Sequence, residues 1–271
     1  MTARLGLRFA ALGYLALLLA APVALVFWRT FEDGLGPVWE ALTNPVTLHA
    51  LWLTVLIALI AVPANTVFGI ACALVLVRHR FHGKSVLNAL VDLPFALSPV
   101  VVGLSLVLVY GQDGWFGNWL AVNGIQILFA LPSMVLATIF VSLPFVVREV
   151  VPVLREVGTE QEEAAWTLGA SSFATFWRIT LPAIRWGLTY GIVLTTARCL
   201  GEFGAVAVVS GRILGQTETL TLRVQNSFEN FDLVGAYTSS IVLALLAVGT
   251  LVVMNLFRKE RHDGNRRPAG Q

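Results

Sequence analysis

The sequence predicts an all-α integral membrane protein with six transmembrane helices. Apolar residues make up 57% of its 271 residues and charged residues only 13%, whereas a soluble domain carries about 25% charged residues. Six apolar stretches are each long enough to cross a bilayer, which takes about 20 residues of helix. The Lys and Arg residues are concentrated in the loops on one side of these stretches, as is typical of multi-pass membrane proteins.

The six stretches follow one another without an internal repeat or a low-complexity linker, so residues 1–271 are interpreted as one domain. They cover residues 9–28, 48–77, 87–110, 126–147, 186–209 and 234–257. The second is long enough to tilt or to extend beyond the bilayer. The first could instead be a signal peptide, with Arg4 and Arg8 before it and Ala20-Ala21 late in it, although its apolar run is longer than the usual one.

The charge distribution predicts the orientation. If the N-terminus is cytoplasmic, fourteen of the eighteen Lys and Arg residues fall on the cytoplasmic side. Only Arg29, Arg212 and Arg223 fall in outer loops, and Arg198 lies within the fifth stretch. Because positive loops stay in the cytoplasm, both termini are predicted to be cytoplasmic. The basic residues form no stripe with interleaved aromatic residues, so membrane lipid and no nucleic acid is the expected environment.

The sequence contains no pattern typical of a metal site or an enzyme. Cys72 and Cys199 both fall inside apolar stretches, which favours small buried hydrophobic residues over a disulfide framework. The four histidines are spread out, and no further ligands complete a metal site. No nucleophile–base pair lies near a membrane face, so no catalytic residue is expected.

The inner loop over residues 156–182 is too long for a simple connector and is predicted to form two short helices. Thr159 to Glu162 form a capping-box pattern, in which the Thr159 hydroxyl and the Glu162 carboxylate would satisfy the first free amides. Gly169 would end the first helix.

The second short helix is predicted to begin at Ser171 or Ser172 and to run through Ile179. Pro182 would then stop it, or would begin the fifth span.

This loop resembles the EAA loop of ABC-importer permeases. Glu163-Ala164-Ala165, Gly169 and Ile179-x-Leu181-Pro182 match the signature at every position. The resemblance implies a MetI-like type I ABC importer transmembrane domain whose cytoplasmic coupling helices sit in a groove on a separate ATPase subunit. The coupling residues that it implies are Glu162, Glu163, Ala164, Ala165, Gly169, Ile179, Leu181 and Pro182. An alternative is an amphipathic helix on the membrane surface, but its polar face should be basic and this loop begins with acidic residues.

The chain itself is not expected to bind a nucleotide cofactor. His82-Gly83-Lys84-Ser85 is similar to the end of a phosphate-binding loop, but Arg78 stands where the motif requires its first glycine. The tetrapeptide also lies in a short inner turn rather than between a strand and a helix. ATP and Mg²⁺ are therefore expected on the partner ATPase.

Further segments resemble one branch of this family. Asp92 to Gly103 looks like the sulfate and molybdate permeases, and the segments 185–188, 197–198, 201–206 and 208–211 are most similar to the CysW family of sulfate/thiosulfate permease subunits. That resemblance implies a bacterial cytoplasmic (inner) membrane, a periplasmic or surface binding protein, a CysT-like sister permease and two copies of an ATPase. Molybdate or tungstate remains an alternative cargo, because all these substrates are compact oxyanion dianions.

Four polar residues within the apolar stretches are candidates for the translocation pathway. Arg198 falls near the predicted bilayer midplane, and Glu202 four residues later could pair with it. The pair could lower the barrier for a dianion, or it could be a structural ion pair that locates the fifth stretch. Ser98 before Pro99 could line the path at a broken helix, and Asn65 could line it or bond between helices.

An ion-coupled secondary transporter is the alternative from another functional class. Such a protein is expected to contain inverted repeats and several buried carboxylates. Only Glu202 lies well inside an apolar stretch of this chain, which favours the ATP-driven permease.

Overall fold

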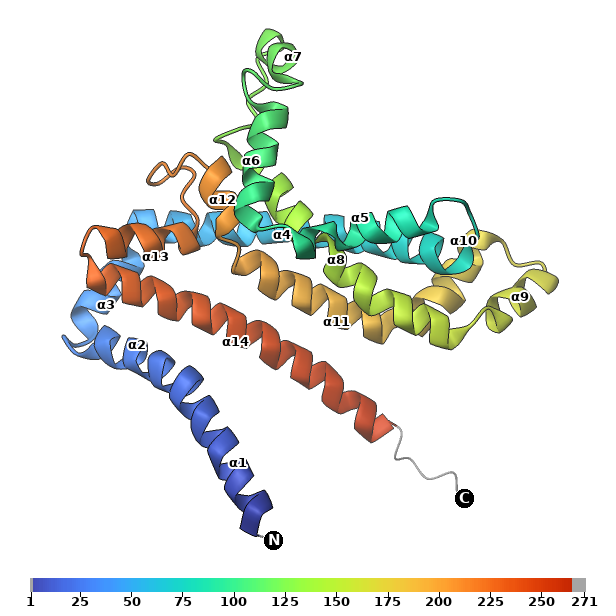
Figure 1. Cartoon of the computed structure of the whole chain (residues 1–271), viewed down its shortest axis with the longest axis horizontal. Coiled ribbons are helices and arrows are strands. Elements are labelled where there is room, and N and C mark those ends of the chain that lie inside the picture. The colour runs from blue at the N-terminus through green and yellow to red at the C-terminus, as the bar shows by residue number, and fades with distance from the viewer. Residues whose placement is uncertain (1, 265–271) are drawn as a thin grey trace.

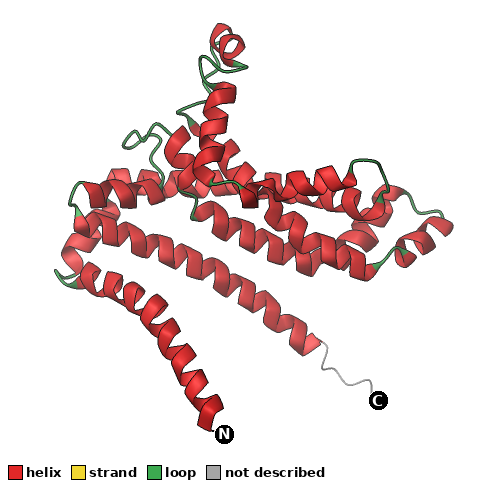
Figure 2. Ribbon diagram, viewed as in Figure 1, coloured by secondary structure: helices red, strands yellow, loops and turns green. Residues whose placement is uncertain are grey.

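The computed structural model describes residues 2–264, and the described chain consists of helices joined by short loops (Figure 2). The first half comprises α1 (Thr2–Leu15), η1 (Ala16–Ala20), α2 (Ala21–Phe31), α3 (Leu35–Thr43), α4 (Pro45–Arg78), α5 (Lys84–Ala96), α6 (Pro99–Tyr110) and α7 (Gly117–Val122). The second half comprises α8 (Leu131–Val157), α9 (Glu160–Thr167), α10 (Ser172–Thr175), η2 (Phe176–Thr180), α11 (Leu181–Leu200), α12 (Gly204–Val209), α13 (Leu220–Glu229) and α14 (Leu233–Gly264). Residues 265–271, with the predicted cytoplasmic Arg266 and Arg267, lie outside the described residues.

The helices α4, α8 and α11 form the centre of the bundle, and small residues allow them to approach closely. A side-chain carbon at Gly69 of α4 would lie 2.6 Å from the Val146 side chain of α8, and one at Gly191 of α11 would lie 3.0 Å from the Val146 Cα. A larger residue at either position would require α8 to shift. The helices thereby bury an aliphatic layer that includes Leu154 and Ile184, both fully buried.

The long helices α4, α8 and α11 lie roughly along the same axis, and the shorter elements lie at the two ends of the bundle (Figure 1). α9 and α10 lie at one end of the bundle, whereas α3 and α13 lie at the other. α14 packs against α11, α13 and α3. The N-terminal helix packs through α2 against α3 and α14, and then diverges from the bundle.

Each of the two π-helical turns comes just before a proline. η1 ends two residues before Pro22, and η2 ends two residues before Pro182. Proline lacks an amide hydrogen and clashes with the carbonyl four residues earlier, so a wider turn relieves both problems. As a result the chain is helical without interruption from Ser172 to Leu200. The prediction that Pro182 stops the second loop helix is therefore wrong. Pro182 is the second residue of α11, which continues the helical chain from η2.

Two of the predicted stretches are broken rather than straight. The stretch 87–110 is divided into α5 and α6, which meet at an angle of 112° around Leu97 and Ser98. The stretch 186–209 is divided into α11 and α12, with residues 201–203 between them. Pro99 accounts for the first break because it disfavours helical geometry at the residue before it.

Four helical segments are long and apolar enough to span a membrane: Ala10–Phe31, Pro45–Arg78, Leu131–Val157 and Leu233–Thr250. The bent pair α5 and α6 would supply a fifth. α11 is not among them, because Arg185, Arg198 and three threonines lower its mean hydropathy. α8 also begins five residues later than the stretch 126–147 and continues ten residues beyond it.

Candidate coupling surface and intramembrane polar site

The loop over residues 156–182 forms a bracket at one end of the bundle. α8 ends before Gly158, whose φ of 70° turns the chain, and α9 ends before Gly169, whose φ is 86°. The Ser171 hydroxyl then accepts a hydrogen bond from the Ala174 amide at 3.3 Å. Gly169 as the terminator and Ser171 as the cap agree with the sequence predictions.

A buried ion pair fastens this bracket to the bundle. Arg78, the last residue of α4, places its Nε 2.9 Å from Oε2 of Glu162 in α9. Its guanidinium also donates to the Leu154 carbonyl at 3.1 Å and to the Gly158 carbonyl at 2.7 Å. The Thr180 hydroxyl donates to Glu162 Oε1 at 2.8 Å. One arginine therefore joins the end of α4, the end of α8 and α9.

The capping-box prediction for Thr159 and Glu162 is wrong. The Glu162 side chain is 8% exposed and turns inward to Arg78, because a buried guanidinium binds a carboxylate more strongly than exposed amides do. Thr159 has φ −111° and ψ −7° and makes no side-chain cap. Its hydroxyl instead donates to Glu163 Oε1 at 2.7 Å.

The predicted coupling residues divide into inward-facing and outward-facing sets. Glu162 and Ala165 are buried, and Leu181 packs against the central aliphatic layer. Glu163, Ala164, Gly169 and Pro182 are exposed, and Ile179 is half-buried. The inward set holds the bracket in place, and the outward set forms part of its free surface.

Large apolar side chains dominate that free surface. Leu168 is 88% exposed and Phe173 is 74% exposed, and Trp166 and Trp177 are each about half exposed. The Phe173 and Trp177 rings lie 6.0 Å apart. We call these four residues the bracket patch. The signature-based prediction did not include them, although their aromatic character next to the signature was visible in the sequence.

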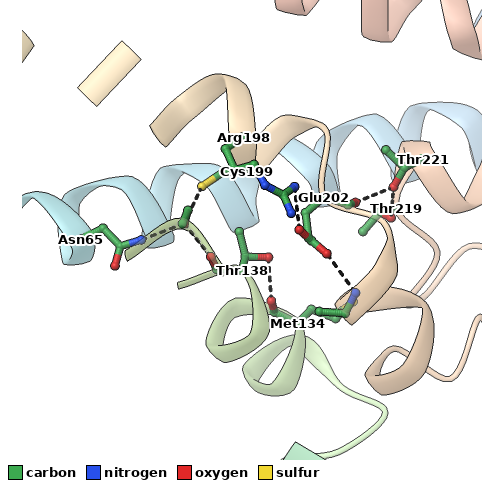
Figure 3. Close-up of polar contacts among 10 residues, drawn as sticks. Asn65, Met134, Thr138, Arg198, Cys199, Glu202, Thr219 and Thr221 are labelled. Carbon is green, nitrogen blue, oxygen red and sulfur yellow. Dashed lines mark hydrogen bonds and ion pairs between the residues drawn. The ribbon is translucent and has the colours of Figure 1, made fainter. Parts of the chain in front are cut away.

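A second ion pair lies at the break between α11 and α12 (Figure 3). Arg198 Nη1 is 2.7 Å from Glu202 Oε2, and the arginine side chain is 29% exposed whereas the glutamate is 2% exposed. The other carboxylate oxygen of Glu202 accepts from the Ala205 amide at 2.9 Å, and so caps α12. The Glu202 carbonyl accepts from the Thr221 hydroxyl at 2.8 Å, which joins the break to α13.

The pairing of Arg198 and Glu202 agrees with the sequence prediction, but its geometry differs. The prediction placed both residues on one face of a continuous helix. α11 ends at Leu200, and Glu202 lies in the connection to α12. Because the Glu202 carboxylate also accepts a hydrogen bond from the Ala205 amide, it has a polar partner besides Arg198.

Asn65 takes part in a separate buried network among α4, α8 and α11 (Figure 3). It is fully buried, and its Nδ2 donates to Ser142 Oγ at 2.8 Å and to the Ile139 carbonyl at 3.1 Å. The Cys199 thiol also donates to Ser142 at 3.3 Å. This is the arrangement of a residue that forms hydrogen bonds between helices, which was one of the two roles considered for Asn65.

Ser98 stands at the bend between α5 and α6, where it is exposed and makes no side-chain cap. The two helix breaks touch each other, since a side-chain carbon at Gly204 would lie 3.0 Å from the Pro99 Cβ. Ser98 and the Arg198–Glu202 pair therefore belong to neighbouring breaks. Asn65 bonds to Ser142, which also accepts from the Cys199 thiol next to Arg198.

Asp92 and Arg148 form an ion pair between α5 and α8 that sequence reasoning missed. Arg148 is one of the fourteen basic residues predicted to lie on the cytoplasmic side. Among residues 2–264 no three His, Cys, Asp or Glu side chains come close enough together to hold a metal ion.

Long apolar helices, a buried polar layer and a projecting bracket at one end define a multi-pass membrane protein of the transport type. The chain belongs to the family of binding-protein-dependent transport system inner membrane components, whose sequence profile matches residues 65–260.

Curated relatives align over nearly the whole chain. It is 53% identical to the sulfate transport system permease protein CysW of Synechocystis sp. over 249 residues, which cover 92% of this chain and 90% of the relative. The CysW of Escherichia coli is 49% identical over 90% of this chain and 84% of its own length. The sulfate transport system permease protein CysT of Synechococcus elongatus is 40% identical over 93% of this chain and 91% of its own length.

The fold is that of ABC-importer transmembrane subunits. A chain of a bacterial ABC transporter involved in the import of alginate superposes with a TM-score of 0.79 over 95% of both chains, at 14% sequence identity. The all-helical, MetI-like architecture expected from the EAA resemblance is thereby confirmed.

Proposed function

We propose that this chain is the CysW-type permease subunit of an ATP-driven importer of sulfate or thiosulfate. The observation that carries the proposal is identity of about 50% to CysW sulfate permeases, spread over about nine-tenths of the chain. Molybdate or tungstate is the alternative cargo. The CysT relatives, at about 40% sequence identity, are also named as sulfate permeases, which favours sulfate.

The proposed topology has six membrane crossings and cytoplasmic termini. The pairs α5 with α6 and α11 with α12 serve as the two broken crossings, where freed backbone groups are shielded by neighbouring helices. α14 runs from the α3 end of the bundle toward the bracket end, and α1 with α2 runs toward the α3 end, so the free ends of α1 and α14 both lie away from α3 (Figure 1). This arrangement and the excess of Lys and Arg on that side support a cytoplasmic bracket.

The bracket is proposed to couple the permease to a separate ATPase subunit. The Arg78–Glu162 pair fixes α9 to the two long helices α4 and α8. A displacement of α9 is therefore transmitted directly to these helices and is not absorbed by a flexible loop. The exposed bracket patch provides the apolar centre that a stable protein contact needs. The chain itself is proposed to bind no nucleotide cofactor, and ATP with Mg²⁺ belongs to the partner.

The anion pathway is proposed to pass the two adjacent helix breaks. Arg198 offers a partly exposed guanidinium there, and Ser98 lies at the neighbouring bend. A broken helix within a membrane typically marks a transport path. The competing role, a structural ion pair that anchors α12, is supported by the capping contact of Glu202.

The complete transporter is proposed to contain this chain, a CysT-like sister permease, two ATPase copies and an external binding protein. Synechococcus elongatus has both a CysW and a CysT relative of this chain, which supports a pair of different permeases. The family description supports dependence on a binding protein.

Copurification separates the importer from an ion-coupled transporter. The tagged chain, extracted in mild detergent, should carry the sister permease and the ATPase with it. Recovery of a lone chain that transports sulfate without ATP would contradict the proposal. Radiolabelled sulfate uptake in a deletion strain, with thiosulfate and molybdate as competitors, then identifies the cargo.

A further inference from the structure

The ion pair between Asp92 of α5 and Arg148 of α8 joins two helices that lie side by side (Figure 1). The Arg148 Nε donates to Asp92 Oδ1 at 2.6 Å, and its Nη2 donates to the other carboxylate oxygen. Nη2 also donates to the Asn88 amide oxygen at 3.4 Å. One edge of the guanidinium is thus held in place by a bidentate contact.

The pair lies well inside the length of three helices. At 1.5 Å per residue, Asp92 lies about 12 Å from the first residue of α5, and Arg148 lies about 14 Å from the last residue of α8. Gly69 of α4, which packs against Val146, likewise lies about 14 Å from the last residue of its helix. These three helix ends are cytoplasmic in the proposed topology, so the pair lies in the inner half of the membrane.

Neither side chain of this pair is covered by the subunit. The Arg148 side chain is 37% exposed and that of Asp92 is 41% exposed, whereas the carboxylates of Glu162 and Glu202 are buried in their ion pairs. An ionised group inside a membrane faces the interior of a bundle or a water-filled cavity, because lipid solvates it poorly. The free face of the pair therefore points to a polar space rather than to lipid.

The same face leads outward to the bend between α5 and α6. One helical turn beyond the pair, the rings of Phe95 and Phe145 meet edge to face with their centroids 5.3 Å apart. Ser98 at the bend follows three residues after Phe95. The surface shared by α5 and α8 thus connects the ion pair to the helix break.

Arg148 lies inward of Arg198 along the bundle. Cys199, the neighbour of Arg198, donates to Ser142 of α8 at 3.3 Å and so marks the level of that arginine. Ser142 precedes Arg148 by six residues, which is about 9 Å of helix. The two guanidinium groups therefore occupy successive levels, and Arg148 is the one nearer the bracket.

Arg148 retains hydrogen-bond donors for a ligand. Asp92 and Asn88 engage its Nε and Nη2, and within residues 2–264 no group accepts a hydrogen bond from Nη1. A guanidinium edge of this kind suits an oxyanion. The Asp92 carboxylate compensates part of the positive charge, and permeation requires sites in series that release their ion as readily as they bind it. Arg198 with Glu202 is built in the same way.

We propose that Arg148 binds the transported oxyanion on the inner half of the pathway, about 9 Å beyond Arg198. Asp92 is the positioning residue that orients its guanidinium. The proposal rests on the proposed function, since it requires a pathway for a compact dianion. The anion passes from one carboxylate-paired arginine to the next, and each arginine holds it through N–H groups that the carboxylate leaves free.

Thiol labelling next to Arg148 in the assembled transporter tests the proposal. Asn88→Cys places a thiol beside the guanidinium, and its reaction with a small anionic methanethiosulfonate is timed in sulfate and in chloride at equal ionic strength. The native Cys72 and Cys199 are both buried, so the unsubstituted complex is the blank. We expect sulfate to slow the labelling severalfold, and to lose this effect when Arg148→Gln is added. Arg155→Cys, at an exposed position seven residues nearer the bracket, is the control and should react equally in both salts.

Uptake measurements separate anion binding from a structural role. The double variant Asp92→Asn with Arg148→Gln leaves two amides that can bond to each other and no uncompensated charge. Assembly with the ATPase should therefore be retained while sulfate uptake falls severalfold. Arg148→Lys, which keeps the charge but not the planar fork, should retain more uptake than Arg148→Gln. Full uptake by the double variant, or loss of its assembly, would make the pair a structural tether and overturn the proposal.

The labelling outcomes are also distinguishable from a failure of the proposed function. If Asn88→Cys does not react, the face is covered. If it reacts equally in both salts, or if protection persists with Arg148→Gln, the anion is not bound by Arg148. Each of these results overturns the role of Arg148 while ATP-dependent sulfate uptake by the unsubstituted complex still supports the proposed function. Absence of that uptake would contradict the proposed function and the role of Arg148 with it.

Discussion

Arg78 and Glu162 lie 84 residues apart in the chain and form its most buried ion pair across different helices. The sequence pointed to each residue for another reason. Arg78 interrupted a phosphate-loop pattern, and Glu162 completed a capping box. Their contact depends on where α4 ends relative to α9, which is set by tertiary packing and leaves no local signal.

Replacing Arg78 by Met should loosen the bracket. Loss of one partner leaves a buried carboxylate uncompensated, which typically costs about 3–5 kcal/mol. We expect faster amide hydrogen exchange over residues 158–180 and weaker retention of the ATPase in the purified complex. Arg155→Met, which removes an exposed arginine near the same loop, is the control. Unchanged exchange in Arg78→Met would contradict the structural role of the pair.

Arg198 and Glu202 allow the pathway and structural roles to be separated. Arg198→Gln should reduce sulfate uptake while assembly and basal ATPase activity are retained, because Glu202 still caps α12 through the Ala205 amide. The measurements are radiolabelled uptake and ATP hydrolysis by the purified complex. Loss of assembly in Arg198→Gln would assign the pair a structural role instead.

The effect of replacing Glu202 on thermal stability should depend on which residue replaces it. Glu202→Gln retains an oxygen that can accept the Ala205 amide, whereas Glu202→Leu removes the cap, a change that costs about 0.5–2 kcal/mol. We therefore expect Glu202→Leu to lower the thermal stability of the complex more than Glu202→Gln. Equal destabilisation by the two variants would mean that the cap contributes little.

At the scale of elements, the two breaks show which features the sequence can predict. Pro99 after Ser98 and the glycines at 201 and 204 are local signals of irregular structure. The sequence accordingly offered a broken helix at Ser98. The apolar character of the stretch 186–209 nevertheless predicted a continuous span, because hydropathy carries no information on the direction of the chain. The 112° bend follows from the packing of α6 on α12, and no single-residue property encodes that contact.

Gly103 is the position where this packing is tightest in α6. Gly103→Ala would bring a methyl group within 2.7 Å of the Ala205 carbonyl oxygen, so α6 and α12 must separate. Overpacking of this kind costs about 1–3 kcal/mol, and thermal unfolding in detergent should show it. Gly249→Ala in α14 is the matched control, because no atom lies within 4 Å of the added carbon. If both variants unfold at the same temperature, α6 is not held by this contact.

The bracket patch should govern attachment to the ATPase without supporting the fold. Leu168→Glu and Phe173→Glu introduce charges at side chains that are 88% and 74% exposed, so folding should be unaffected. We expect less ATPase to copurify, because a charge at the centre of an interface is left desolvated. Leu214→Glu, at an apolar residue 54% exposed far from the bracket, should retain the ATPase. Full retention in Leu168→Glu and Phe173→Glu would locate the coupling surface elsewhere.

At the scale of the whole molecule, the chain has the form of a permease subunit. One end carries the bracket, the centre carries the two helix breaks, and α6 and α7 extend away from the bundle (Figure 1). The sequence predicted the helical membrane class, the bracket and its glycine boundaries from periodicity, charge and motif. It could not predict that α6 leaves the bundle, because a stretch that is apolar on all sides looks the same in lipid and inside a protein.

ATP-dependent sulfate uptake tests the central claim most directly. The chain is reconstituted into liposomes with the sister permease, the ATPase and the sulfate-loaded binding protein, and radiolabelled sulfate is counted in the lumen. We predict accumulation with ATP and Mg²⁺ that stops when this chain is omitted or when ATP is replaced by a non-hydrolysable analogue. Equal uptake without ATP, or uptake driven by an ion gradient alone, would contradict the account.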